Sequence, residues 1–135
     1  MLKLAELPTF DEPLLGLERE IMERNWINSY EDMARQVHNI TRSKGFWDKE
    51  GVNRNQPEMI ALIHSELSEA LEALRKNPTA PDKHCENFTN LEVELADAIV
   101  RIMDMSHGLG LRVGEALAAK VRVNAMRPAM HGKAF

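Results

Sequence analysis

Two acidic pairs with the pattern acid-x-x-acid are the residues of this sequence best suited to chemistry. The first pair is Glu66 and Glu69, and the second is Glu94 and Asp97. In a helix, residues three positions apart share a face, with their Cβ atoms about 5–6 Å apart. Because two carboxylates at that distance repel each other, each pair indicates a cation that offsets the repulsion. If the two pairs face each other, they offer four carboxylates to a hard divalent metal ion.

The type of metal follows from the type of ligand. Carboxylates without convergent cysteine or histidine favour Mg²⁺, with Mn²⁺ as a substitute, over zinc. A di-iron helical bundle is the nearest alternative, but it requires Glu-x-x-His motifs on two helices. The sequence offers Asp104 followed by His107, about three turns from the acidic centre, which is a weak match.

The elements that position these acids are predicted to be helices. Thr9 to Glu12 has the pattern of a capping box, which opens a helix to about residue 25. A second helix is expected from Ser29 to near Gly45, and a loop follows to Asn55. Three more helices are expected over residues 57–75, 86–107 and 113–126, ended by Asn-Pro, Gly and Pro signals. The predicted fold is therefore all-α, a four-helix bundle core with an additional N-terminal helix. We expect one domain over residues 1–135, with residues 1–28 as an N-terminal extension helix outside the motif-bearing region.

Helical-wheel positions place both acidic pairs beside apolar surface. Glu66 and Glu69 border the apolar arc of the 57–75 helix. In the 86–107 helix, apolar residues cover about two-thirds of the circumference, which predicts a mostly buried helix. Its narrow polar strip holds Glu94, Asp97, Arg101 and Asp104, and acids in such a strip should be paired or metal-bound. The alternative is that the strip simply faces water. We interpret Arg101 as a structural counter-ion rather than a catalytic residue.

Composition limits the function classes. The chain has 135 residues, 44% of them hydrophobic and 28% charged, as in a soluble globular domain. Its formal net charge of −4 argues against general nucleic-acid binding, which is driven by basic surface. The single cysteine, Cys85, fits a reducing compartment, and the sequence has neither a signal-peptide pattern nor a membrane span. We therefore expect a cytoplasmic protein without membrane contact.

Residues 64–74 and 94–104, which contain the acidic pairs, resemble the MazG-like superfamily of all-α nucleoside triphosphate pyrophosphohydrolases. The resemblance extends to residues 44–47 and, downstream, to Lys120, Asn124 and Arg127 followed by Pro128. It covers roughly residues 30–135. One departure is Ser65, which stands where many relatives have an additional glutamate beside the first acidic pair.

The resemblance implies that the chain hydrolyses a (deoxy)nucleoside triphosphate between the α and β phosphates, giving a monophosphate and pyrophosphate. Such an enzyme removes non-standard or surplus nucleotides. Glu66, Glu69, Glu94 and Asp97 would bind Mg²⁺, which neutralises the triphosphate and polarises water. Glu69 is our choice for the general base. The resemblance also implies a homodimer or a homotetramer.

Other residues are candidates for substrate binding. Lys120, Asn124 and Arg127 lie on one stripe of the last helix, where they suit phosphate oxygens or ribose; the alternative is a solvated basic face. Trp47, ahead of Phe46, is a candidate for stacking on the base, and His38 or Asn39 for contacting its edge. The alternative is that aromatics in such a loop cap the core.

Two further functions fit the same sequence. The first is a helical interaction or regulatory module that has kept the bundle and lost turnover. The second is a phosphoribosyl-ATP pyrophosphohydrolase, a member of the same superfamily that uses similar acids on a different substrate. The presence of all four acids and of the Lys-Asn-Arg group favours the nucleotide pyrophosphohydrolase.

Overall fold

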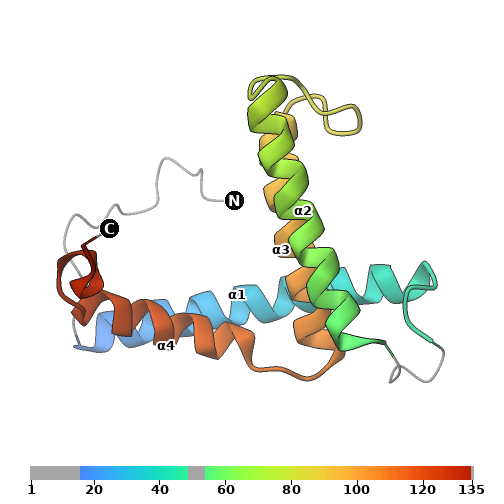
Figure 1. Ribbon diagram of the computed structural model, residues 1–135. Coiled ribbons are helices and arrows are strands. Elements are labelled where there is room, and N and C mark those ends of the chain that lie inside the picture. The colour runs from blue at the N-terminus through green and yellow to red at the C-terminus, as the bar shows by residue number, and fades with distance from the viewer. Residues whose placement is uncertain (1–15, 49–53, 135) are drawn as a thin grey trace.

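The computed structural model describes residues 16–48 and 54–134, which form α-helices and no β-strand (Figure 1). The all-α class predicted from the sequence is therefore confirmed. The four α-helices are α1 (Gly16–Ser43), α2 (Gln56–Lys76), α3 (Asn90–Gly108) and α4 (Val113–Met126), and a short 3₁₀ helix, η2 (Ala129–Gly132), follows them. None of the helices in the described ranges combines the length and the apolar content that a membrane span requires.

Helices α2 and α3 form an antiparallel hairpin, and this hairpin and α4 both pack against α1. In Figure 1, α2 and α3 run side by side and stand on the C-terminal half of α1, while α4 lies along its N-terminal half. The extensively packed pairs are α2 with α3, α1 with α3, and α1 with α4. The hairpin and α4 therefore lie at different ends of α1.

Helix α1 is longer than the sequence predicts. We predicted two helices separated near residues 26–28, but residues 16–43 form one continuous helix, so this boundary is wrong. No proline or glycine occurs between Leu17 and Ser43, and an isolated Ser29 does not break a helix whose packing favours continuation. Residues 16–28 are consequently the first half of α1 and not a separate extension helix. The predicted capping box at residues 9–12 lies outside the described residues.

The two hairpin helices begin at strong capping residues. Asn55 Oδ1 accepts a hydrogen bond of 3.0 Å from the backbone N–H of Glu58 at the start of α2, and Pro57 occupies the first turn. Thr89 and Glu92 form a reciprocal capping box at the start of α3. The start that we predicted near residue 86 is therefore wrong. Before Thr89 the chain turns around Asp82, whose Oδ1 accepts the backbone N–H groups of residues 84 and 85, each at 2.8 Å.

Within the single chain, α3 is less buried than its apolar coverage predicts. Its buried residues are Ala98, Met103, Asp104 and Ser106, so the expectation of a mostly buried helix is wrong for one chain. Helix α2 likewise exposes large side chains. We call the following exposed side chains the hairpin apolar residues: Ile60, Leu67, Leu71, Leu74, Leu95, Ile99, Val100 and Ile102.

Candidate metal centre

The packing of α2 against α3 brings acids from both predicted pairs together. Glu66 comes from α2, and Glu94 and Asp97 come from α3. One carboxylate oxygen from each of these three residues lies within 4.8 Å of the other two. Glu66 is buried, Glu94 is partly buried and Asp97 is exposed, so the group opens toward solvent on one side.

Glu69, the fourth predicted acid, lies beside this group rather than within it. It is one turn along α2 from Glu66, and its carboxyl shares a hydrogen bond with Glu94. Glu69 and Glu94 also line a common hollow near the connection that joins α2 to α3. We call Glu66, Glu69, Glu94 and Asp97 the acid cluster.

The acid cluster has an excess of negative charge. Burial raises the pKa of Glu94 to about 7, with further contributions from the charge of Glu69, its hydrogen bond, and the charges of Glu66 and Asp97. Desolvation also raises the pKa of Asp97, and the charge of Glu66 adds to this while Arg101 opposes it. A divalent cation at this position would offset the repulsion that shifts both groups.

The donor set fits a hard divalent cation. Each member of the acid cluster offers carboxylate oxygen, and neither histidine nor cysteine belongs to the described group of ligand atoms. Mg²⁺ and Mn²⁺ prefer such ligands, whereas zinc favours nitrogen and sulfur. The di-iron alternative gains no support, because Asp104 is hydrogen-bonded to His38 and is not part of that group.

The raised pKa of Glu94 predicts how stability depends on pH in the metal-free protein. Between pH 4.5 and about 7 the folded state holds a proton on Glu94 that the unfolded state releases. The free energy of unfolding therefore falls as pH rises through this window. We expect the melting temperature in EDTA to be lower at pH 7.5 than at pH 5.5, measured by circular dichroism, and Mn²⁺ to raise it at pH 7.5.

Glu94→Gln provides the control for this pH dependence, because an amide does not titrate. The variant should lose most of the slope between pH 5.5 and pH 7.5. An unchanged slope in Glu94→Gln would show that other groups cause it.

A second set of polar contacts centres on Asp104, which is only 5% exposed. Its Oδ1 lies 2.9 Å from His38 Nδ1 and accepts hydrogen bonds from Thr41 Oγ1 at 2.6 Å and Trp47 Nε1 at 2.9 Å. Its Oδ2 accepts a longer bond of 3.4 Å from Arg54 Nη1. We call these five residues the Asp104 network. It ties α1, the turn after α1 and the segment before α2 to α3.

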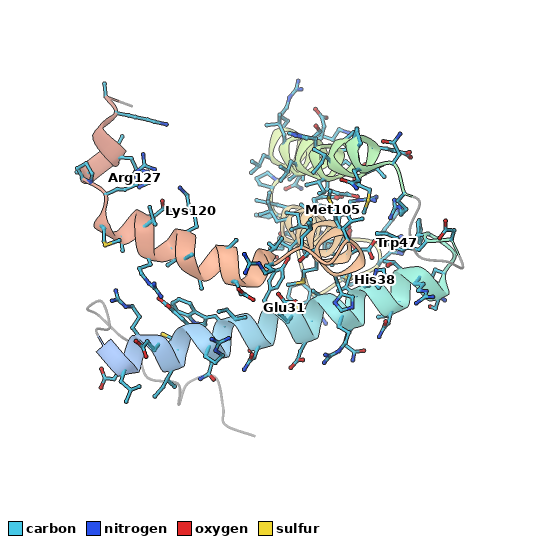
Figure 2. The ribbon with its side chains drawn as sticks, turned by 90° about the horizontal axis from the view of Figure 1, so that it is seen from below. Glu31, His38, Trp47, Met105, Lys120 and Arg127 are labelled. Carbon is cyan, nitrogen blue, oxygen red and sulfur yellow. The ribbon has the colours of Figure 1, made fainter. Side chains whose placement is uncertain are left out.

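Trp47 and His38, both predicted to contact substrate, are buried in this network. Trp47 is 4% exposed, and its ring meets that of His38 edge-on with centroids 4.9 Å apart (Figure 2). A Cβ added at Gly108 would lie 2.4 Å from the Trp47 ring, so α3 packs closely against it. The neighbouring Phe46, which we ranked below Trp47 as a stacking residue, is 61% exposed. In this structure Phe46, and not Trp47, presents its ring to solvent.

A cavity of about 240 Å³ connects the acid cluster with the Phe46 turn. Its lining includes Glu66, Asp97 and Arg101 from the hairpin, and Thr41 and Phe46 from the end of α1 and the turn after it. Its remaining lining residues are Val100 and Asp104.

The predicted phosphate-binding group on α4 lies away from the acid cluster. Figure 2 shows Lys120 on α4 and Arg127 just beyond its C-terminal end, both turned away from α1 and well separated from Trp47 and His38. Lys120 and Arg127 are exposed. Asn124 Oδ1 is buried without a hydrogen-bond partner in the described part of the chain. The fold of one chain thus does not bring these three residues to the carboxylates.

Comparison with known proteins finds no significant match: no family model, no curated protein and no solved structure is similar to the chain. The functional interpretation therefore depends on the geometry of the acid cluster and on the motifs described above.

Proposed function

We propose that the chain is a Mg²⁺-dependent nucleotide pyrophosphohydrolase of the MazG-like type, which cleaves a (deoxy)nucleoside triphosphate between the α and β phosphates. The observation that carries the proposal is the convergence of two acid-x-x-acid pairs from neighbouring helices. The same pairs provide the resemblance on which the choice of substrate depends. Removal of non-standard nucleotides is the role that such an activity would serve.

In this proposal Glu66, Glu94 and Asp97 hold the metal and Glu69 acts on the water. The metal, when bound, supplies a Lewis acid that neutralises the triphosphate and activates water. Glu69 is exposed and adjoins the other three carboxylates without belonging to their group. A carboxylate in this place is suited to accept the proton of the attacking water, which is the role of a general base.

The cavity beside the acid cluster suggests how a bound nucleotide would be oriented. With the triphosphate at Glu66 and Asp97, the nucleoside end would extend toward Phe46, which lines the same cavity. An exposed aromatic ring offers a stacking surface to any base. Trp47 and His38 would then hold the turn through Asp104 rather than contact the base.

We further propose that the active form is a homodimer or homotetramer. The hairpin apolar residues are more exposed than is usual for leucine and isoleucine in helices, and burial against another copy would remove them from water. The α4 helix of a second copy could bring Lys120, Asn124 and Arg127 to the triphosphate. Light scattering coupled to size exclusion measures the oligomeric state, and a monomer at micromolar concentration would contradict this part of the proposal.

The decisive experiment is a panel of canonical and modified (deoxy)nucleoside triphosphates, and phosphoribosyl-ATP, incubated with Mg²⁺. Release of pyrophosphate together with the monophosphate supports cleavage between the α and β phosphates. Release of inorganic phosphate and a diphosphate would point to a different bond. Turnover of phosphoribosyl-ATP alone would reassign the substrate, and no turnover of any compound would favour the catalytically silent module.

A further inference from the structure

Arg101 is bound to one of the proposed metal ligands. Its Nε donates a hydrogen bond of 2.5 Å to Glu66 Oε1. The Glu66 side chain is 9% exposed and that of Arg101 is 37% exposed, so the pair lies at the edge of the hairpin interior. A guanidinium therefore takes the position of a counter-ion beside the most buried carboxylate of the acid cluster.

The same arginine faces the cavity between the acid cluster and Phe46. Arg101 lines this cavity together with Glu66 and Asp97. Among the described residues, the terminal nitrogens of Arg101 make no hydrogen bond, since its one bond is through Nε. Arginine with free terminal N–H groups is well suited to bind phosphate oxygens.

A divalent cation and Arg101 would compete for Glu66. Each favours the ionised carboxylate, and two cations brought to one carboxylate repel each other. Binding of the divalent cation at Glu66 therefore weakens the ion pair between Glu66 and the Arg101 guanidinium. The cavity is the adjacent space into which the freed guanidinium can turn.

Building on the proposed function, we infer that Arg101 exchanges partners: it pairs with Glu66 in the metal-free protein and binds a phosphate oxygen of the substrate once a divalent cation occupies Glu66. Metal binding and substrate binding are coupled through this one side chain. Arg101 then offsets the repulsion among the acids before the metal arrives, and adds a positive charge to the triphosphate afterwards.

The first test is a calorimetric titration with Mn²⁺ alone, without nucleotide. Arg101→Met and Arg101→Gln remove the competing charge, so both should bind Mn²⁺ about fivefold tighter than the wild type, as expected for loss of a partly exposed ion pair. Arg101→Lys keeps the charge and should bind Mn²⁺ like the wild type. Arg75→Met is the matched control, because Arg75 pairs with Glu72 at 2.9 Å on the exposed side of α2.

The second test is a titration of pyrophosphate into the protein saturated with Mn²⁺. Arg101→Met should bind pyrophosphate about tenfold more weakly than the wild type, because a charge-assisted hydrogen bond is lost, and Arg75→Met should be unchanged. Unchanged or weaker Mn²⁺ binding in both neutral variants, or unchanged pyrophosphate binding, overturns the exchange. Neither titration requires hydrolysis. If both titrations give the expected results but the protein hydrolyses no nucleotide, the proposed function is refuted and the exchange of partners by Arg101 stands.

Discussion

Glu66→Gln and Asp97→Asn are each expected to lower nucleotide hydrolysis by about 100-fold or more, and to weaken Mn²⁺ binding measured by calorimetry. Each substitution keeps the size of the side chain and removes one negative charge from the acid cluster. The two residues come from different helices, with oxygens within 4.8 Å of each other, so both are required for one ion. Loss of either should therefore have a similar effect.

The control for these variants is Glu86→Gln. Glu86 is an exposed acid in the connection before α3 and lies outside the acid cluster, so its substitution should leave activity and metal binding unchanged. Circular dichroism of all three variants should show wild-type helix content. If Glu66→Gln and Asp97→Asn keep full activity, the assignment of the site is wrong even if the chain hydrolyses nucleotides.

The acid cluster could be predicted because its information is local. An acid-x-x-acid spacing in a helix fixes which residues share a face, and apolar residues on both sides fix which face packs. Glu66, Glu94 and Asp97 are therefore close together once α2 and α3 pair. The position of Glu69 beside this group depends on the register of the two helices, which no spacing within one helix determines.

The boundaries of the helices were less predictable than their existence. The signals at Thr89 with Glu92 were present in the sequence, but the acid at residue 86 and the apolar Phe88 extended the apparent helix beyond them. In α1, Ser29 resembles a helix start, yet its surroundings contain no residue that ends the preceding helix. A residue that can cap a helix marks a helix boundary only where the chain also changes direction.

The long-range contacts could not be predicted from the sequence. Asp104 was placed in the polar strip of its helix, and nothing local showed that His38 and Trp47 would converge on it from 66 and 57 residues away. An acid surrounded by apolar neighbours near the end of an otherwise apolar helix was the one available signal. It indicates that the acid needs a partner, but does not identify which donor provides one.

The position of Lys120, Asn124 and Arg127 relative to the acid cluster was likewise not predictable from the sequence. Their spacing predicted one stripe on one helix, but α4 ends at Met126 and Arg127 is its C-cap with extended backbone. The relation of these residues to the acids depends on where α4 packs. Because α4 lies along the N-terminal half of α1, the stripe and the acid cluster are on separate parts of the fold (Figures 1 and 2). A site that needs both has to be completed by a second copy, which is why the oligomeric state bears on the function.

Asp104→Ala is expected to reduce the free energy of unfolding by about 3–5 kcal/mol, the range for removing one partner of a buried charged pair. The alanine leaves the indole N–H of Trp47 without its acceptor, and it removes the carboxylate that His38, Thr41 and Arg54 also contact. Urea denaturation followed by circular dichroism measures the loss. Tryptophan emission should also shift to longer wavelength as Trp47, now 4% exposed, becomes hydrated.

Asp32→Ala is the matched control for this variant. Asp32 is also a helical aspartate paired with an arginine, Arg35, but the two side chains are 69% and 52% exposed. Its removal should change the free energy of unfolding by no more than about 0.5 kcal/mol, because exposed ion pairs contribute little. Equal losses in the two variants would mean that the Asp104 network does not stabilise the turn that carries Phe46. A selective loss in Asp104→Ala would show that this network stabilises the fold at residues that line the same cavity as Glu66 and Asp97, and so links the stability of the fold to the proposed site.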